Sequence, residues 1–333
     1  MRKLLLILMI PILLFSSCNS KENATLSPEP EILYLRYADN QPDDYPTTRA
    51  ARYFAKLVEE RTEGRIQIDV YPDGVMGSEV SVLEQMRFGG IDFARFSLGI
   101  LSDEYPELAV LTLPYIYRDK SHMWKVLDSE IGDYYLNIFP DKQVEGLAWF
   151  DAGARSFYTR KPVHTLEDLE GLRIRVQETD LMMRMFALLN VEPVKVPYGD
   201  VYSALQKNLV DGAENNIPSY YHTGHYEQSP YFFRSEHMRL PELMMMSYSA
   251  RERIAEFDPK LLDIVRECAK EAGEYERVQW EHEELNAIRY CIDNGVEIIR
   301  PSSEERYKLK FAIEEIYEEF SEYDEVIRKI QSM

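Results

Sequence analysis

The spacing of apolar residues predicts alternating strands and helices from residue 32 onward. Apolar side chains alternate along 33–37, recur at helical spacing over 46–61 and alternate again along 66–70. Ser81 and Glu84 form a capping box for a helix that ends at Gly89-Gly90. The next strand is expected at 91–96. Strands separated by helices of this length favour βαβ units and a mostly parallel sheet.

A second series of the same kind begins near Glu145. Strands are predicted at 146–150, 173–176, 194–196, 212–215 and 243–249, with helices up to Asn190 and over 199–207. Residues 259–294 predict one long helix, or two joined at Gly273. A strand at 296–299 and a helix over 303–331 complete the pattern. On a straight helix Cys268 and Cys291 would lie roughly 35 Å apart, so we do not expect them to pair.

The first residues predict export. Arg2 and Lys3 precede an apolar run over 4–15, which is too short to span a bilayer comfortably, and Ser16-Ser17-Cys18 follows. This pattern predicts a signal peptide at 1–17, with Cys18 as the lipidated first residue of the mature chain and 18–31 as a tether. Phe15 departs from the usual leucine of a lipobox, and the alternative is an ordinary cleaved signal peptide.

Composition excludes several classes of protein. The chain has 333 residues and 38 Lys+Arg against 58 Asp+Glu, a formal charge of -20. No basic surplus exists to bind nucleic acid or anionic lipid electrostatically. Three cysteines cannot form a disulfide scaffold or a four-thiolate zinc site.

Motifs for metal or cofactor chemistry are not found in the sequence. His282-Glu283 starts a zincin-like pattern, but Asn286 stands where the second histidine is required. His222 and His225 are three residues apart without a third ligand, which is more typical of a polar helix face than of a metal site. There is no phosphate loop and no nucleophile elbow. We therefore expect no metal, no cofactor and no catalytic residues.

Arg175 is the most informative polar residue. Arg173, Arg175 and Gln177 share one face of a predicted strand, whereas interior strands of parallel sheets are usually apolar on both faces. A guanidinium there is costly unless it has an anionic partner. The residue lies near the carboxyl end of its strand, where open α/β sheets bind ligands, and its fork matches a carboxylate. The alternative is a structural ion pair with an Asp or Glu of the chain.

Arg155 and Asn215 carry weaker signals. Arg155 lies in a turn that leads into an extended stretch, where a solvated surface arginine is the ordinary alternative. Asn215 closes a predicted strand, and its amide can both donate and accept hydrogen bonds. Its alternative role is the N-cap of the following segment. The 23 tyrosines suit a sugar-binding pocket, although most should serve packing.

At these residues the chain resembles the extracytoplasmic solute receptors of tripartite ATP-independent periplasmic (TRAP) transporters, over about residues 32–330. The motifs that carry the resemblance are Ala55–Val58 before Gly64-Arg65, Tyr71-Pro72 with Met76–Ser78, Leu111–Tyr115, Leu169–Val176, Val201–Gln206 and Val210–Asn215. Each motif is weak alone, but their combination in this order is specific.

The resemblance implies an α/β fold of the periplasmic-binding-protein type (type II), a two-lobed clamshell whose lobes are joined by strands and a long helix. The lobes would comprise 32–150 and 151–250, with 251–333 packing back across both. A receptor that closes over an organic anion and delivers it to membrane permease subunits is implied, rather than an enzyme. The resemblance places the carboxylate-clamping arginine at Arg175, a second arginine at Arg155, the ligand asparagine at Asn215 and a flanking aromatic ring at Tyr198. Asn40 matches a polar contact of the first loop.

Three segments resemble the branch of the family that binds sugar acids such as uronates. They are Gly153–Tyr158, Glu214–Tyr221 and Glu236–Glu242, and Arg95 also fits that branch. Glucuronate or galacturonate is therefore the favoured ligand. A C4-dicarboxylate or sialic acid receptor, a lipid-anchored enzyme acting on sugar acids and an adhesin remain as alternatives. We expect a monomer in the periplasm or on the outer face of the cell membrane.

Overall fold

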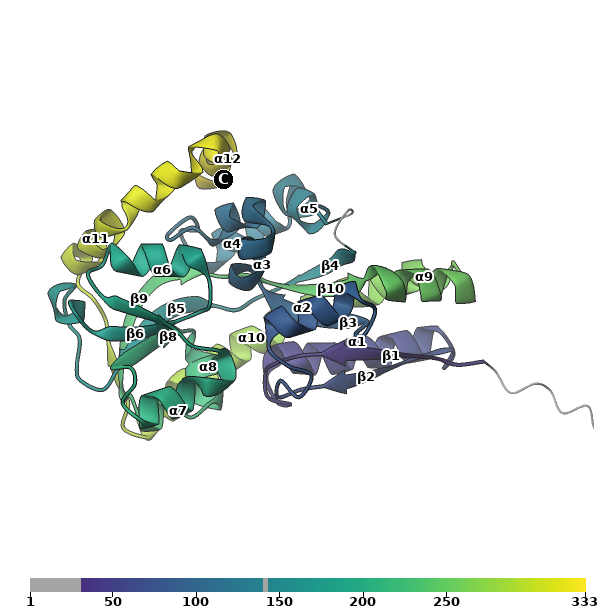
Figure 1. Cartoon of the computed structure of the whole chain (residues 1–333), viewed down its shortest axis with the longest axis horizontal. Coiled ribbons are helices and arrows are strands. Elements are labelled where there is room, and N and C mark those ends of the chain that lie inside the picture. Colours follow the sequence, from purple (N-terminus) through teal and green to yellow (C-terminus); the bar gives the residue numbers. More distant parts are fainter. Residues whose placement is uncertain (1–30, 140–142) are drawn as a thin grey trace, which may run out of the picture. The chain divides into compact units, whose positions relative to one another are not determined.

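A computed structural model describes residues 31–139 and 143–333. The predicted signal peptide, Cys18 and nearly all of the tether lie outside the described residues. Residues 32–333 form one compact unit built around two mixed β-sheets (Figure 1). None of the helices in the described part of the chain is both long enough and apolar enough to cross a membrane.

The first sheet has the strand order β2-β1-β3-β10-β4. Its strands are β1 (Leu33–Ala38), β2 (Ile66–Tyr71), β3 (Phe93–Ser97), β4 (Val144–Phe150) and β10 (Glu242–Ser247). β1 is parallel to β2 and β3, whereas β10 is antiparallel to β3 and β4. The predicted boundary at residue 250 assigned β10 to the second lobe, and this assignment was wrong, because the strand is hydrogen-bonded inside the first sheet.

The second sheet has the order β11-β9-β5-β8-β6-β7. Its strands are β5 (Ala154–Thr159), β6 (Arg173–Val176), β7 (Glu192–Lys195), β8 (Gly212–Asn215), β9 (Tyr231–Arg239) and β11 (Glu297–Ile299). β6 is parallel to β7 and β8, but β5 is antiparallel to β8 and β9. β11 is parallel to β9, so five of the nine strand pairings described in the two sheets are parallel and the expectation of a mostly parallel sheet is met in part. The exceptions involve β5 and β10, which enter from the other sheet and run antiparallel to their neighbours.

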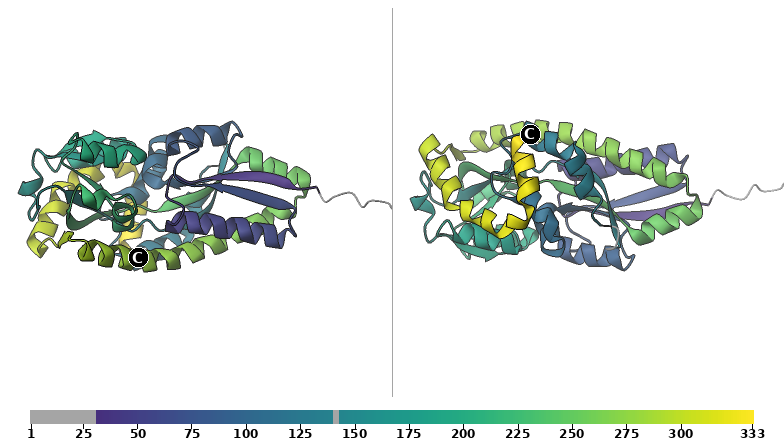
Figure 2. Two further views of the ribbon diagram at one scale, coloured as in Figure 1. Left: turned by 90° about the horizontal axis from the view of Figure 1, so that it is seen from below. Right: turned by 90° about the horizontal axis from the view of Figure 1, so that it is seen from above.

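Two chain crossings and one helix join the sheets. The chain passes from β4 to β5 through 151–153 and returns from β9 to β10 through 240–241. Figure 2 shows helix α10 (Leu261–Asp293) running alongside both sheets. The first half of α10, including Val265, packs in the apolar core beneath the first sheet, and Ala287 near its end packs in the core of the second.

The other helices cover the sheets and their edges. They are α1 (Pro46–Arg61), α2 (Glu79–Arg87), α3 (Leu98–Glu104), α4 (Lys120–Leu127), α5 (Glu130–Leu136), α6 (Asp180–Ala187), α7 (Val201–Gln206), α8 (Ile217–His222), α9 (Tyr248–Phe257), α11 (Ser303–Ala312) and α12 (Asp324–Ser332). The C-terminal elements reach distant parts of the chain. Leu166 N donates to Glu305 of α11, and His122 Nε2 lies 2.9 Å from the carbonyl oxygen of Ile330 in α12.

Two local predictions differ from the structure, and the choice between one long helix and two over 259–294 is decided. Helix α2 begins earlier than expected, because Ser78 is its N-cap and accepts a hydrogen bond from Ser81 N at 3.4 Å. The expected helix over 303–331 is divided into α11, a segment of 3-10 helix over Glu314–Tyr323 in which the backbone of Phe320 leaves the helical region, and α12. Helix α10 is continuous through Gly273, where a Cβ atom would lie 3.1 Å from the Trp149 carbonyl oxygen; glycine thus allows close packing on β4.

Candidate functional site

The carboxyl ends of strands from both sheets meet at one cavity. β1, β3, β6 and β8 end there, and β5 and β10 begin there because they run antiparallel to their neighbours. The cavity has a volume of about 470 Å³, which suits a small organic ligand. All six predicted ligand residues line it: Asn40, Arg95, Arg155, Arg175, Tyr198 and Asn215.

Arg175 is a buried cation without a carboxylate partner among the residues that the structure describes. Its side chain extends from β6, and the residue is only 2% exposed. Nε donates to the carbonyl oxygen of Val196 at 2.9 Å, whereas Nη1 is buried and has no hydrogen-bond partner in the described part of the chain. Burial lowers the pKa of Arg175 from its ordinary value. The alternative of a structural ion pair for this residue was therefore wrong.

Arg155, in contrast, is neutralised within the protein. Nε lies 2.5 Å from Glu214 Oε2 and Nη2 lies 2.7 Å from Glu214 Oε1, so the two side chains form a fork-to-fork pair between β5 and β8. Nearby His237 stays uncharged, because burial, together with the charge of Arg155, lowers its pKa to about 3. Nη1 of Arg155 makes no hydrogen bond to any described residue and remains available as a donor on the cavity wall.

Asn215 presents a free amide donor at the end of β8. Its Oδ1 accepts from Asn216 N at 2.8 Å, and its Nδ2 has no partner among the described residues. The alternative role of Asn215 as an N-cap was wrong, since the following helix α8 is capped by Asn216, whose Oδ1 accepts from Ser219 N at 2.7 Å. Asn215 is thus free to donate a hydrogen bond into the cavity.

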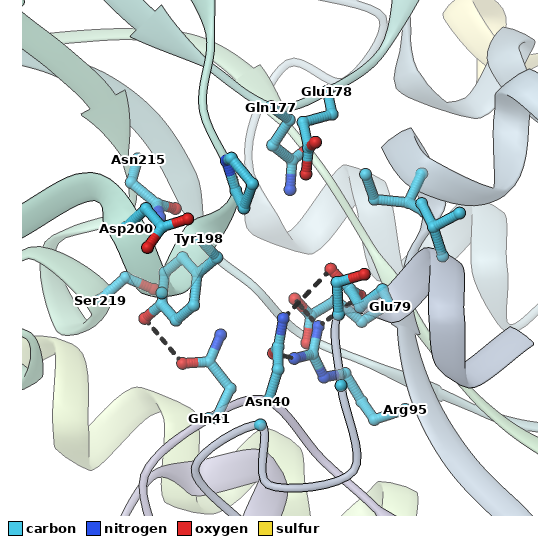
Figure 3. A pocket seen from close by; sticks show the side chains of 18 of the residues that line it. Asn40, Gln41, Glu79, Arg95, Gln177, Glu178, Tyr198, Asp200, Asn215 and Ser219 are labelled. Atoms are coloured by element: carbon cyan, nitrogen blue, oxygen red, sulfur yellow. Dashed lines mark hydrogen bonds and ion pairs between the residues drawn. The ribbon is translucent and has the colours of Figure 1, made fainter. Parts of the chain in front are cut away.

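Hydrogen bonds cross the cavity from one sheet's side to the other. Tyr198 donates through its hydroxyl to Gln41 Oε1 at 2.8 Å, as Figure 3 shows. Gln177, which follows β6, donates to Ser97 Oγ at 3.1 Å. Gln177 also lies close to the backbone of Gly99 at the start of α3, since a Cβ atom on that glycine would lie 2.6 Å from Gln177 Oε1. These contacts bring the ring of Tyr198 and the first-sheet loops to the same cavity.

Arg95 is saturated by acceptors of its own chain. Nε and Nη2 donate to Asp39 Oδ1 at 3.1 and 3.0 Å, and Nη1 donates to Glu79 at 3.0 Å and Glu242 at 3.1 Å. Nη2 also donates to Asn40 Oδ1, and the Asn40 amide donates to Glu79 Oε2 at 3.4 Å. A guanidinium has five N–H donors, and all five are used here. Arg95 therefore lines the cavity without a donor left for an anion.

The cavity has two sides with different residues, as Figure 3 shows. Asn40, Glu79 and Arg95 cluster on one side, and Asn215, Asp200, Tyr198 and Ser219 lie on the other. Glu242, which begins β10, belongs to the first group and is 6% exposed. Its Oε2 atom has no hydrogen-bond partner among the described residues. Burial raises the pKa of Glu242 to about 8, despite the opposing charge of Arg95.

The sequence did not single out five acceptors of this site, the amide of Gln41 and the carboxylates of Asp39, Glu79, Glu214 and Glu242. The chain is so rich in acids that none of these carboxylates stands out from the pattern. The arginines are the sequence feature that could have revealed these acceptors, because each buried arginine requires acceptors close to it.

No group of three potential metal ligands occurs in the described ranges. His222 pairs with Glu283 at 2.9 Å, and His225 Nδ1 lies 2.9 Å from the Tyr158 hydroxyl.

Residues 37–323 match bacterial extracellular solute-binding protein family 7, DctP. The chain belongs to this family. A solute-binding protein of Chromohalobacter salexigens is 36% identical over 280 residues, which cover 84% of this chain and 82% of that protein. Members of the family are solute receptors, so this chain is a TRAP-type receptor rather than an enzyme, and its two-lobed α/β fold class is confirmed.

Two solved structures of TRAP periplasmic solute-binding proteins are similar over most of the chain. One, from Xanthobacter autotrophicus with bound β-D-galacturonate, has a TM-score of 0.85 and 36% identity, covering 90% of this chain and 99% of that chain. The other, from Pseudomonas putida with bound D-glucuronate, has a TM-score of 0.85 and 33% identity, covering 90% and 97%.

Proposed function

We propose that this DctP-family protein captures a sugar acid by its carboxylate and delivers it to the membrane permease subunits of a TRAP transporter. Galacturonate and glucuronate are the favoured ligands. The observation that carries the proposal is the unpaired, buried guanidinium of Arg175 on the wall of the cavity. A ligand carboxylate supplies the anion that no described residue of the chain provides there.

The neighbouring groups support a carboxylate at this position. Arg155 Nη1 and Asn215 Nδ2 bond to none of the described residues, and both side chains line the same cavity as Arg175. Charged hydrogen bonds of this kind are stronger than neutral ones. Tyr198 offers the sugar ring an aromatic surface, because a sugar presents apolar C–H groups as well as hydroxyls.

The sugar part of the ligand would contact the first-sheet side of the cavity. Glu79 and Glu242 offer carboxyl oxygens there, and the oxygens of Asn40 and Gln41 lie close by. Hydroxyl groups can donate to all of these acceptors. The uronates bound in the two similar structures have this combination of one carboxylate and several hydroxyls.

Isothermal titration calorimetry of the purified protein tests the proposal. We expect D-galacturonate or D-glucuronate to bind more tightly than succinate, malate or N-acetylneuraminate. A thermal-shift screen provides an independent readout, since ligand at 100 times its dissociation constant adds about 2.7 kcal/mol of apparent stability. Preferential binding of a C4-dicarboxylate, with no response to either uronate, would contradict the proposal.

We also propose that Cys18 anchors the receptor by a lipid to the outer face of the cell membrane and that it acts as a monomer. The short apolar run and the small residues before Cys18 support the anchor. Mass spectrometry of the membrane fraction should find a diacylated or triacylated N-terminal Cys18. An unmodified mature chain in the soluble fraction would contradict the anchor, and a dimer mass in light scattering would contradict the monomer.

A further inference from the structure

We propose that the first-sheet side of the cavity restricts the receptor to ligands with a single carboxylate and that Glu79 and Glu242 determine this selectivity. Acids with a carboxylate at both ends would be rejected, even when their carbon skeleton is that of a bound uronate. The inference rests on the proposed function, because it takes Arg175 as the place where one carboxylate binds.

The arginines of the cavity differ in whether a carboxylate of the chain balances their charge. Three arginines line the cavity. Arg95 donates all five of its N–H groups to acceptors of the chain, and Arg155 is paired with Glu214. None of the described lining residues is a lysine or a histidine. Within the described part of the cavity, Arg175 is thus the one cation whose charge is not balanced by a carboxylate.

The opposite side carries excess negative charge. Arg95 lies within 3.1 Å of oxygens of Asp39, Glu79 and Glu242, so one guanidinium faces three carboxyl groups. Glu79 is also fixed as an acceptor by Ser97 N, which donates to its Oε1 at 2.6 Å. A second ligand carboxylate at this side would meet like charges in a buried setting and would lose its water without gaining a cation.

Glu242 independently indicates that a neutral hydroxyl belongs at this side. Its buried Oε2 lines the cavity without a hydrogen-bond partner among the described residues, and an unpaired buried polar atom is unfavourable unless a ligand satisfies it. A sugar hydroxyl can donate to an ionised Glu242 or accept from a protonated one. A carboxylate could accept a hydrogen bond from a protonated Glu242, but it would then lie beside the carboxylates of Asp39 and Glu79. A hydroxyl meets no such repulsion.

The matched ligand pair for the test is galacturonate and galactarate. The two share their carbon skeleton, but galactarate carries a second carboxylate at C1 and cannot close to the pyranose ring of galacturonate. L-Galactonate, an open-chain acid with a single carboxylate on the same skeleton, is therefore the control for ring form, and galactarate should bind more weakly than L-galactonate as well. We expect calorimetry at pH 7 to show galactarate binding roughly 100-fold more weakly than galacturonate, or more weakly still. The pair glucuronate and glucarate should behave in the same way.

Two variants test whether the side chains of Glu79 and Glu242 cause the selectivity. Glu79→Gln keeps the shape of the side chain and removes a charge, so it should reduce the preference for galacturonate about tenfold. Glu242→Gln provides a second variant if Glu79→Gln folds poorly, and it is tested at pH 9, because burial raises the pKa of Glu242 to about 8 and the side chain carries its charge only above that pH. Glu84→Gln is the matched control on the same helix, because Glu84 pairs with Arg87 outside the cavity and should leave the preference unchanged.

The outcomes separate this inference from the proposed function. If galacturonate binds and galactarate binds within about threefold of it, the selectivity is wrong and the sugar-acid receptor stands. If Glu79→Gln at pH 7 and Glu242→Gln at pH 9 both fold and keep the full preference of the original chain, Glu79 and Glu242 do not determine it. If succinate binds and no sugar acid does, the proposed function and the inference fail together.

Discussion

Replacement of Arg175 by methionine separates a ligand clamp from a structural residue by the sign of its effect on stability. The Arg175 guanidinium is buried, has one hydrogen bond, to the Val196 carbonyl, and has no carboxylate partner among the described residues. Arg155 is equally buried but is paired with Glu214 through two hydrogen bonds between their side chains. The same substitution at the two arginines therefore has opposite consequences for the ligand-free protein.

The expected changes in stability and affinity follow from the groups that each arginine contacts. Exchange of a buried ionic group for an apolar one of similar volume is often neutral or stabilising by about 1–4 kcal/mol, so the melting temperature of Arg175→Met should be unchanged or higher. Arg155→Met leaves Glu214 as an uncompensated buried charge, which costs about 3–5 kcal/mol. Loss of the clamp should weaken uronate binding by about 2–5 kcal/mol, or roughly 30-fold to several thousand-fold.

The assay combines differential scanning calorimetry of the ligand-free variants with titration of galacturonate. Arg155→Met should melt several degrees below the original chain, and the double variant Arg155→Met/Glu214→Gln should recover part of the loss. Arg175→Met should lose affinity without losing stability. A large fall in the melting temperature of Arg175→Met, with affinity near that of the original chain, would refute the assignment of Arg175 as the clamp.

Three further results are expected. Asn215→Ala removes a free amide donor from the cavity and should weaken uronate binding about tenfold or more in calorimetry, without a matching loss of stability; unchanged affinity would exclude the contact. The pKa of Glu242 is raised to about 8, so its protonated form favours the folded state and this contribution falls as pH rises from about 4.5 to 8. Glu242→Gln should accordingly gain stability relative to the original chain, by up to a few kcal/mol between pH 5 and pH 9, and a constant difference in melting temperature would argue against the shift. Burial raises the pKa of Cys268 to about 11 and that of Cys291 to about 12, so neither thiol should react with a thiol reagent at pH 8 before unfolding, and rapid labelling of the native protein would contradict their burial.

The sequence predicted the helices and strands that can be recognised from the apolar spacing within the element itself. Helix α1 has the bounds expected from its apolar spacing, and α10 occupies nearly the whole stretch without breakers. Strand β9 was missed, because its buried positions include the polar residues Ser235 and His237 and its pairing partners β5 and β11 lie far away in the sequence. The placement of β10 in the first sheet also depends on pairing over a long sequence distance, which periodicity does not report.

The arginines of the site could be predicted from the sequence, whereas the carboxylates that pair with them could not. Arg175, on a strand whose other face carries the apolar residues Ile174 and Val176, pointed to the cavity from the sequence alone. The difference between Arg175, Arg155 and Arg95 was not predictable, because it depends on which carboxylate each one reaches in three dimensions. Glu214 reaches Arg155 only because β5 and β8 pair in a register that sets Phe157 opposite Glu214. Three similar guanidinium groups thus acquire different roles from strand pairing.

A crystal structure of the protein with D-galacturonate tests the central claim most directly. The account predicts that the carboxylate accepts two hydrogen bonds from Arg175 and that the C1 end of the sugar lies beside Glu79 and Glu242. A galacturonate bound in the reverse orientation, with its carboxylate on the first-sheet side and no anion at Arg175, would contradict it.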